Sequence, residues 1–158
     1  MTATFAANTS VEARLDQLES RTAISELAAR YCRGVDRREP ETFAGIWHDD
    51  AEYLIGSDRG NFKGLDDIRR FSEIVVRVWR ETYHWPTNHE VTFRDRDTAD
   101  GLSEAFAVCV NHEGKVCFIA ARYTDEYSRR DGEWKIARRQ VKRWFMSEPQ
   151  DIKLTVPT

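Results

Sequence analysis

The segment Arg30-Tyr31-Cys32-Arg33-Gly34-Val35-Asp36-Arg37-Arg38 ends the first long run of helically spaced apolar residues, and the fold is organised around it. Apolar residues recur three and four positions apart over residues 11–35, which predicts an amphipathic helix. Gly34 suits the end of such a helix, which we expect at residues 35–38. Asp36 then lies at the helix C-terminus, where a carboxylate opposes the helix dipole. An acid in this position is better explained by a specific partner than by a purely structural role.

Two further helices and a set of strands are expected on either side of this segment. Ser20 or Thr22 would break the first helix into two. Downstream we predict a short helix from Pro40 to a turn at residues 48–50, a strand at 51–55, a loop at 56–60, a short strand at 61–63 and a third helix at 65–81. From Tyr83 the apolar spacing alternates, which predicts strands at residues 83–93, with a bulge at Pro86, and at 102–112, 116–127 and 133–145. Residues 1–10 and 148–158 are expected to be flexible tails.

Helices followed by a run of antiparallel strands favour an α+β fold. We expect a cone-shaped, curved sheet, mixed or antiparallel, that wraps around three N-terminal helices and encloses a pocket. A cavity of this kind is a usual place for a small-molecule site. The 158 residues fit a single domain with one core.

Composition narrows the class of protein. With 41% hydrophobic and 32% charged residues, the chain has an ordinary globular composition. A net charge of -3 gives no broad cationic surface, so nucleic acid is not an expected partner. No apolar run reaches the ~20 residues of a membrane span, and residues 1–10 do not have the pattern of a signal peptide. We therefore expect a cytoplasmic protein that contacts no membrane.

The three cysteines are expected to be reduced thiols. Cys32 lies within the first predicted helix, and Cys109 and Cys117 lie within predicted strands. Cys109 and Cys117 could face each other across a hairpin, so a disulfide between them is the less favoured alternative.

No metal or nucleotide cofactor is expected. His48-Asp49-Asp50 resembles a metal cluster, but three adjacent residues at a helix end point in different directions. His89 and His112 stand singly on strands. The sequence also contains no glycine-rich phosphate loop, no Gly-x-Ser-x-Gly motif and no dinucleotide-binding fingerprint.

Several motifs together resemble the nuclear-transport-factor-2-like superfamily in its SnoaL-like branch. The matching segments span residues 19–143 and are Gly34-Val35-Asp36-Arg37-Arg38, Ile46-Trp47-His48-Asp49-Asp50-Ala51-Glu52-Tyr53, Phe62-Lys63-Gly64, His84 with Thr87-Asn88, and Asp125-Glu126-Tyr127-Ser128-Arg129-Arg130-Asp131-Gly132-Glu133-Trp134-Lys135. Within that branch the chain is similar to hexachlorocyclohexane dehydrochlorinases, bile-acid 7α-dehydratases and, more distantly, scytalone dehydratases. This fold also hosts isomerases, hydrolases and proteins that are not enzymes, so the resemblance implies the fold more directly than the activity.

The resemblance implies four catalytic residues. The catalytic Asp and His of the dehydrochlorinases fall on Asp36 and His84, and an Arg on their last strand falls on Arg139. Those enzymes carry a Lys where this chain has Tyr31, whereas the bile-acid dehydratases have a Tyr-Asp-His trio at this spacing. Some of the dehydratases add an acid on a middle strand, and this chain has none over residues 105–110.

Each of these residues has a chemical role and a plainer alternative. His84 would be the general base, because an imidazole is close to neutral at working pH, and the alternative is a core or strand-edge histidine. Asp36 would fix the imidazole tautomer and stabilise the imidazolium, and the alternative is a helix-end carboxylate beside neighbouring arginines. Tyr31 would assist the leaving group, although a buried tyrosine also has a packing role. Arg139 would stabilise negative charge, or equally form a surface or intersubunit ion pair.

The family pattern also suggests a substrate-binding wall. Its residues are mostly apolar or aromatic, which suits a hydrophobic, steroid-like or polycyclic substrate: Tyr53, Val75, Trp79, Ile119, Ala121 and Tyr123. Asn88 would hydrogen-bond the substrate, or simply sit in a strand bulge. Each wall residue could instead be core packing.

We therefore predict a cofactor-independent lyase that removes water from a hydrophobic hydroxy compound. The alternatives are a dehydrochlorinase of chlorinated cyclohexanes, a ketosteroid-type isomerase and a non-catalytic ligand-binding module. A homotrimer or homodimer is also expected, because Trp134, Ile136 and Trp144 alternate opposite Arg139 and would form an apolar outer sheet face.

Overall fold

The computed structural model describes residues 10–56 and 60–155. Residues 1–9 and 156–158 of the expected tails, and residues 57–59 of the expected loop, lie outside the described residues. Within the C-terminal segment, Gln150 pairs with Val116 through two main-chain hydrogen bonds of 2.8 and 2.9 Å.

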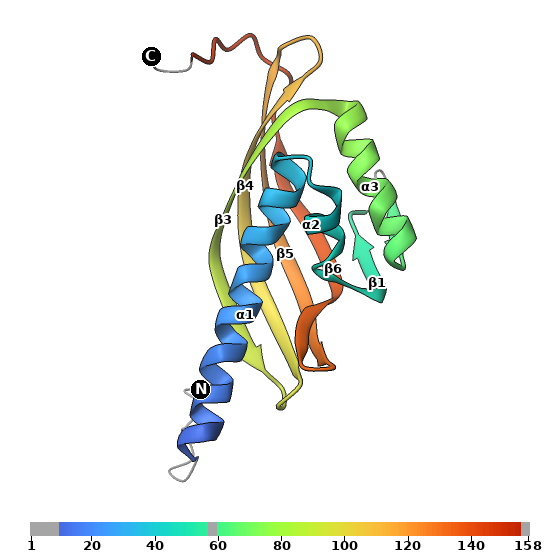
Figure 1. The fold of residues 1–158 in the computed structure, drawn as a ribbon. Coiled ribbons are helices and arrows are strands. Elements are labelled where there is room, and N and C mark those ends of the chain that lie inside the picture. The colour runs from blue at the N-terminus through green and yellow to red at the C-terminus, as the bar shows by residue number, and fades with distance from the viewer. Residues whose placement is uncertain (1–9, 57–59, 156–158) are drawn as a thin grey trace.

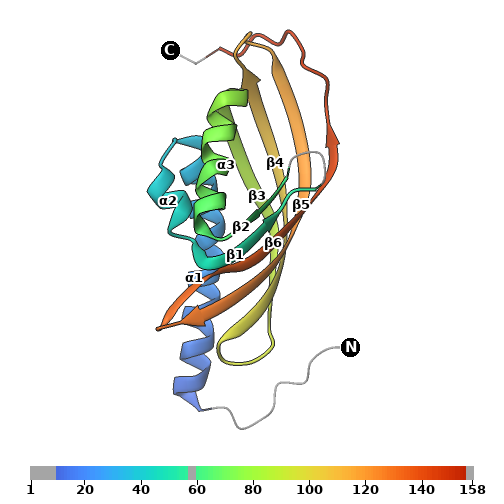
Figure 2. The same ribbon diagram turned by 90° about the vertical axis from the view of Figure 1, so that its right-hand side faces the viewer.

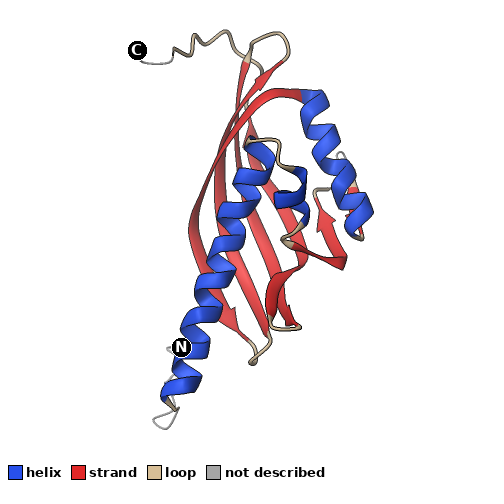
Figure 3. Ribbon diagram, in the orientation of Figure 1, coloured by secondary structure: helices blue, strands red, loops and turns tan. Residues whose placement is uncertain are grey.

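Three helices lie against one face of a six-stranded sheet (Figure 1 and Figure 3). The helices are α1 (Val11–Asp36), α2 (Pro40–Ala44) and α3 (Leu65–Val78). The strands are β1 (Trp47–Leu54), β2 (Asn61–Lys63), β3 (Trp79–Phe93), β4 (Thr98–Asn111), β5 (Val116–Arg130) and β6 (Glu133–Met146). The strand order is β2-β1-β6-β5-β4-β3; β1 and β6 are parallel and the other pairs are antiparallel. The predicted α+β fold with a curved, mixed sheet is confirmed, and Figure 2 shows the sheet curving around the helices.

Several element boundaries differ from the prediction, and two of them lie near the segment that follows α1 and the start of β3. Residues 48–50 belong to strand β1 and do not form a turn. Helix α3 ends at Val78, so Trp79 starts β3 four residues before the predicted strand. The Trp79 amide still donates to the Val75 carbonyl of the last helical turn.

Register shifts bend the sheet. They occur in β3 at residues 79–81 and 87–90, and in the β5–β6 pair at residues 120–121 and 126–127. An extra residue in one strand increases its local twist and bends it. Pro86, on the edge strand β3, pairs in register with Ala105 of β4, so there is no bulge at Pro86. The bulge lies two residues later, next to Asn88, which has a φ of 51°.

A β6 bulge also corrects the expected outer face. Glu126 pairs with Arg138 but Tyr127 pairs with Ile136, which leaves one extra residue in β6 and reverses the side-chain alternation. Ile136 and Trp134 therefore point to the same side as Arg139 and belong to the core. The exposed aromatic residues of the outer face include Trp85, Phe106, Trp144 and Phe145.

Helix α1 is continuous. Ser10 caps it by accepting a hydrogen bond from the Ala13 amide, and the expected break near Ser20 is absent. The Ser20 hydroxyl is buried and accepts a hydrogen bond from Arg129, while Thr22 donates to the Leu18 carbonyl. Both hydroxyls are thus satisfied without interrupting the helix.

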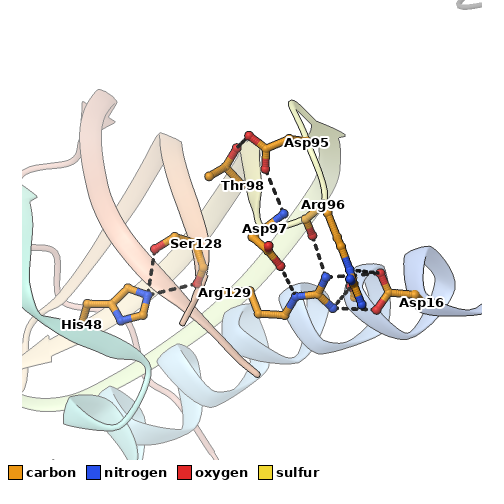
Figure 4. A network of polar contacts seen from close by, with 9 residues as sticks. Asp16, His48, Asp95, Arg96, Asp97, Thr98, Ser128 and Arg129 are labelled. Carbon is orange, nitrogen blue, oxygen red and sulfur yellow. Dashed lines mark hydrogen bonds and ion pairs between the residues drawn. The ribbon is translucent and has the colours of Figure 1, made fainter. Parts of the chain in front are cut away.

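Arg129 fastens the N-terminal half of α1 to the sheet (Figure 4). Its guanidinium donates to both Asp16 oxygens, at 2.7 and 3.2 Å, to Asp97 at 2.8 Å and to the Arg96 carbonyl at 2.8 Å. Its side chain is only 13% exposed. Arg129 is therefore a largely buried structural residue.

Two glycines permit close packing between neighbouring elements. A Cβ on Gly34 would lie 2.7 Å from the Phe43 amide nitrogen, so this glycine lets α2 approach α1. A Cβ on Gly101 would overlap the Tyr127 ring, which lies over β4 at this point.

All three cysteines are thiols, and Cys109 and Cys117 are register partners across β4 and β5. Over residues 10–56 and 60–155, no helix is long and apolar enough to cross a membrane.

Candidate active site

The end of α1 meets β3 through Asp36 and His84. Asp36 Oδ1 lies 2.6 Å from His84 Nδ1, and Asp36 Oδ2 accepts the His84 backbone N–H at 2.8 Å. A carboxylate oxygen only accepts, so Nδ1 carries a proton, and in the neutral imidazole Nε2 then holds the lone pair. The two side chains are 18% and 13% exposed. Nε2 has no hydrogen-bond partner in the described part of the chain, which leaves it available as a base.

Tyr31 lies beside this pair in a buried aromatic cluster. Its ring is edge-on to the His84 ring, with centroids 6.2 Å apart, and its hydroxyl is 2.7 Å from the Tyr53 hydroxyl. Because one hydroxyl donates to the other, the second keeps a proton that it can give elsewhere. Burial raises the pKa of Tyr31 well above its ordinary value, and it raises the pKa of Tyr123 to about 12. These phenols therefore stay protonated at working pH.

Arg139 lies at the centre of the cluster, fully buried. It donates to Asp125 twice, through Nε at 2.8 Å and through Nη2 at 2.7 Å. Its guanidinium carbon lies 4.7 Å from the Tyr31 ring centroid and 4.5 Å from that of Tyr123. Burial would lower the pKa of Arg139, but the charge and hydrogen bonds of Asp125 outweigh it and raise the pKa. The remaining nitrogen, Nη1, is buried and donates to no atom of the described residues.

The six expected wall residues share the interior with these groups. Tyr53, Trp79, Ala121 and Tyr123 are buried in the same hydrophobic core, and Ile119 packs against it. Register places Ile119 in one row with His84, because both pair with Ala107 of β4.

One expected site residue lies elsewhere. Asn88 is exposed and donates to Glu104 at 2.6 Å, on the outer side of the sheet, because the bulge turns it away from the interior. Val75 is buried in the same core as the other wall residues, and it also lines a groove of about 340 Å³ at the junction of α1, α2 and α3, together with Val35 and Arg38.

His48 does not take part in a metal cluster. It lies on β1, and its Nε2 is 3.0 Å from the Ser128 carbonyl and 2.9 Å from the Ser128 hydroxyl (Figure 4). The described residues contain no group of three or more His, Cys, Asp or Glu side chains arranged to hold a metal ion.

Comparison with known proteins places this architecture in a family. A model described as a SnoaL-like domain matches residues 16–140. Over 126 residues the chain is 37% identical to hexachlorocyclohexane dehydrochlorinase 1 of Sphingobium indicum, which covers 78% of this chain and 81% of that protein. This chain belongs to the SnoaL-like family.

Solved structures agree with the SnoaL-like assignment. A type 2 hexachlorocyclohexane dehydrochlorinase matches with a TM-score of 0.85 at 33% identity, covering 91% of this chain and 98% of that chain. A scytalone dehydratase-like protein from Novosphingobium aromaticivorans matches with a TM-score of 0.79 at 21% identity, covering 90% and 93% of the two chains, and shares the fold. The family and its dehydrochlorinase relatives support a lyase activity for this SnoaL-like protein.

Sequence reasoning missed the residues that hold Arg139. Asp125 is 1% exposed and is the register partner of Arg139 across β5 and β6. Tyr127 donates to Asp125 at 2.6 Å, and His89 Nε2 lies 3.2 Å from the same phenol oxygen. Since Tyr127 gives its only proton to Asp125, His89 must donate to Tyr127. Asp125 and Tyr127 alternate with Glu126 and Ser128, a pattern that could have identified them as inward-facing.

Replacing Asp125 by Asn should destabilise the protein strongly, because the Arg139 charge would remain buried without a counter-charge. We expect a loss of about 3–5 kcal/mol in the free energy of unfolding, measured by urea denaturation. The matched control is Glu126→Gln on the same strand, whose carboxylate pairs with the partly exposed Arg138. The control should change stability by less than about 1 kcal/mol. If the two variants lost the same stability, the Asp125 carboxylate would not be compensating a buried Arg139 charge.

The buried phenols should also make the protein unstable in base. Burial raises the pKa of Tyr31, Tyr53, Tyr123 and Tyr127, while unfolded tyrosines ionise near a pKa of about 10. The buried tyrosines contribute their full stabilisation at a pH below the unfolded-state pKa. This stabilisation is lost as the pH rises through their folded-state pKa values. In a titration to about pH 11 followed by tyrosinate absorbance, only the exposed Tyr83 should ionise before unfolding. Ionisation of further tyrosines while circular dichroism remains native would contradict this.

Proposed function

We propose that this SnoaL-like protein is a lyase that removes a proton and a leaving group from neighbouring carbons of a hydrophobic substrate, without a metal or organic cofactor. The observation that carries the proposal is the 2.6 Å contact between Asp36 and His84, made while Asp36 also holds the His84 backbone. Two contacts to one residue fix both the tautomer and the direction of the imidazole. His84 Nε2 is then a preorganised base.

The leaving group that the geometry favours is hydroxide, lost as water. Hydroxide departs only with a proton, and the hydrogen-bonded Tyr31 and Tyr53 hydroxyls retain one that is free to be donated. In the reaction, His84 takes the C–H proton, the electrons form the carbon–carbon double bond, and Tyr31 protonates the departing oxygen. The imidazolium then returns a proton to the phenolate, directly or through solvent. Arg139 stabilises the negative charge that develops, since its Nη1 has no protein acceptor in the described residues.

The substrate class follows from the surroundings of this group. Tyr53, Trp79 and Tyr123 are aromatic, Ala121 and Ile119 are aliphatic, and all face the sheet interior. Such surroundings favour a steroid-like, bile-acid-like or polycyclic hydroxy compound over a small, highly polar one.

Dehydrochlorination is the second candidate function. It is favoured by the 37% identity to hexachlorocyclohexane dehydrochlorinase 1. Chloride leaves without a proton, so this reaction needs the base and a stabilising charge but no acid. The same His84, Asp36 and Arg139 would serve, and Tyr31 would be a spectator.

Replacing His84 by Ala should abolish turnover on whichever substrate is identified. Candidates are hydroxysteroids, screened by mass spectrometry for loss of one water, and chlorinated cyclohexanes, screened for chloride release. A positioned base contributes about 10²–10⁴ in rate, so kcat should fall by at least about 100-fold. His112→Ala is the matched control, because His112 is exposed and its ring hydrogen-bonds the Val76 carbonyl, away from Asp36 and His84. A His84→Ala variant that folds and turns over at the wild-type rate would disprove the base assignment.

Replacing Tyr31 by Phe should separate the two leaving groups. Loss of water should slow by about 10²-fold or more, because the proton donor is removed, while loss of chloride should be nearly unchanged. Tyr83→Phe serves as the control, since Tyr83 is exposed and its hydroxyl donates to Glu81. Equal effects of Tyr31→Phe on both reactions would mean that Tyr31 does not protonate the leaving group.

A further inference from the structure

The turn that follows Asp36 contains an unusual residue. Glu39 N–H donates to the Gly34 carbonyl at 3.0 Å, which is the hydrogen bond of a Schellman helix end. The residue in the left-handed position of this motif is Arg38, with a φ of 58°. Glycine is the usual residue there, because a side chain strains this backbone conformation. The chain therefore keeps an arginine where the backbone alone would favour glycine.

The Arg38 side chain connects two elements. Its Nη1 donates to the Val35 carbonyl at 3.0 Å in the last turn of α1. Its Nη2 donates to the Trp79 carbonyl at 3.1 Å, with the Arg80 carbonyl at 3.5 Å, where β3 begins. In the described part of the chain its hydrogen bonds go to main-chain carbonyls and to no carboxylate. One planar guanidinium thus joins the end of the helix to the start of the strand.

These two ends carry the proposed acid–base pair. Asp36 directly follows Val35, and His84 lies five residues after Trp79 on the same strand. The first pairing of β3 with β4 is irregular between Trp79 and Glu81, so the sheet holds this part of the strand less regularly. A clamp between Val35 and Trp79 sets how closely the strand approaches the helix.

We propose that Arg38 is a positioning residue, which holds the end of α1 against β3 so that Asp36 stays within hydrogen-bond reach of His84. The inference rests on the proposed function, because it concerns the same pair of side chains. A displacement of about 1 Å in such a pair is enough to cost about 10²-fold in rate. An arginine that strains its own backbone while bridging two elements is the kind of local conflict that marks a functional position.

The decisive variant is Arg38→Gly, because it relieves the strained φ while it removes the guanidinium. The melting temperature should stay within about 5 °C of the parent, since the two changes oppose each other. kcat should fall by about 10-fold or more with KM little changed, because the base is misplaced and substrate contacts remain. Arg38→Lys should give a smaller loss, because an ammonium reaches one or two of the carbonyls but cannot span them in a plane.

A readout without substrate tests the clamp directly. The proton in the 2.6 Å bond between His84 Nδ1 and Asp36 should give a far-downfield proton resonance in the free protein. Arg38→Gly should move this resonance upfield or broaden it beyond detection. The matched control is Arg33→Ala, at the same helix end, whose guanidinium donates to the neighbouring Glu39 and does not reach β3. The control should leave both the resonance and kcat unchanged.

The outcomes separate this inference from the proposed function. An Arg38→Gly variant with a wild-type resonance and kcat would overturn the positioning role. So would a kcat that returns to the parent value once the variant is fully folded at low temperature, because the role would then be stability alone. If His84→Ala kept its activity, the proposed function would fail, yet the resonance would still decide whether Arg38 holds the pair together.

Discussion

The burial of one charge, the Arg139 guanidinium, constrains the rest of the structure. A cation in an apolar interior is tolerated only when a counter-charge and well-formed hydrogen bonds replace water. Asp125 supplies both, and it can do so only because β5 and β6 are aligned to place the two residues opposite each other. The faces of Tyr31 and Tyr123 cover the guanidinium on the remaining sides. Strand register, bulge position and aromatic packing are thus all tied to this pair.

The proposed acid–base pair forms under a different constraint, at the border between a helix and a strand. Asp36 lies where the helix dipole disfavours it, and two N–H donors of His84 compensate for that position. Tyr31 is less than two turns earlier on the same helix, so its ring reaches both His84 and the buried guanidinium. The C-terminal end of α1 therefore links the interior cation to the partly exposed imidazole. The chemistry that we propose depends on this continuity.

Much of this arrangement could be predicted from the sequence, and the failures have physical causes. Apolar spacing located the helices and strands, and the Gly34–Arg38 motif with His84 identified the pair that the structure brings together. Trp134 and Ile136 were assigned to the wrong face, because one extra residue in β6 reverses the alternation and no local signal marks the bulge. Asn88 lies in a bulge of β3, which is the alternative that the sequence left open beside a substrate contact. Asp125 and Arg129 were overlooked, because a charged residue in a sequence does not reveal a partner from another element until the fold brings the two together.

Gly101 shows how an absent methyl group can define one end of the sheet interior. The Tyr127 ring lies over the β4 backbone in space that any other residue at position 101 would occupy. The phenol can therefore reach inward to Asp125 and close the sheet interior on that side with an aromatic plane. A larger residue at this position would turn the phenol aside and remove one hydrogen bond of the charged pair. The packing around the buried charge therefore depends on the absence of a side chain on the neighbouring strand.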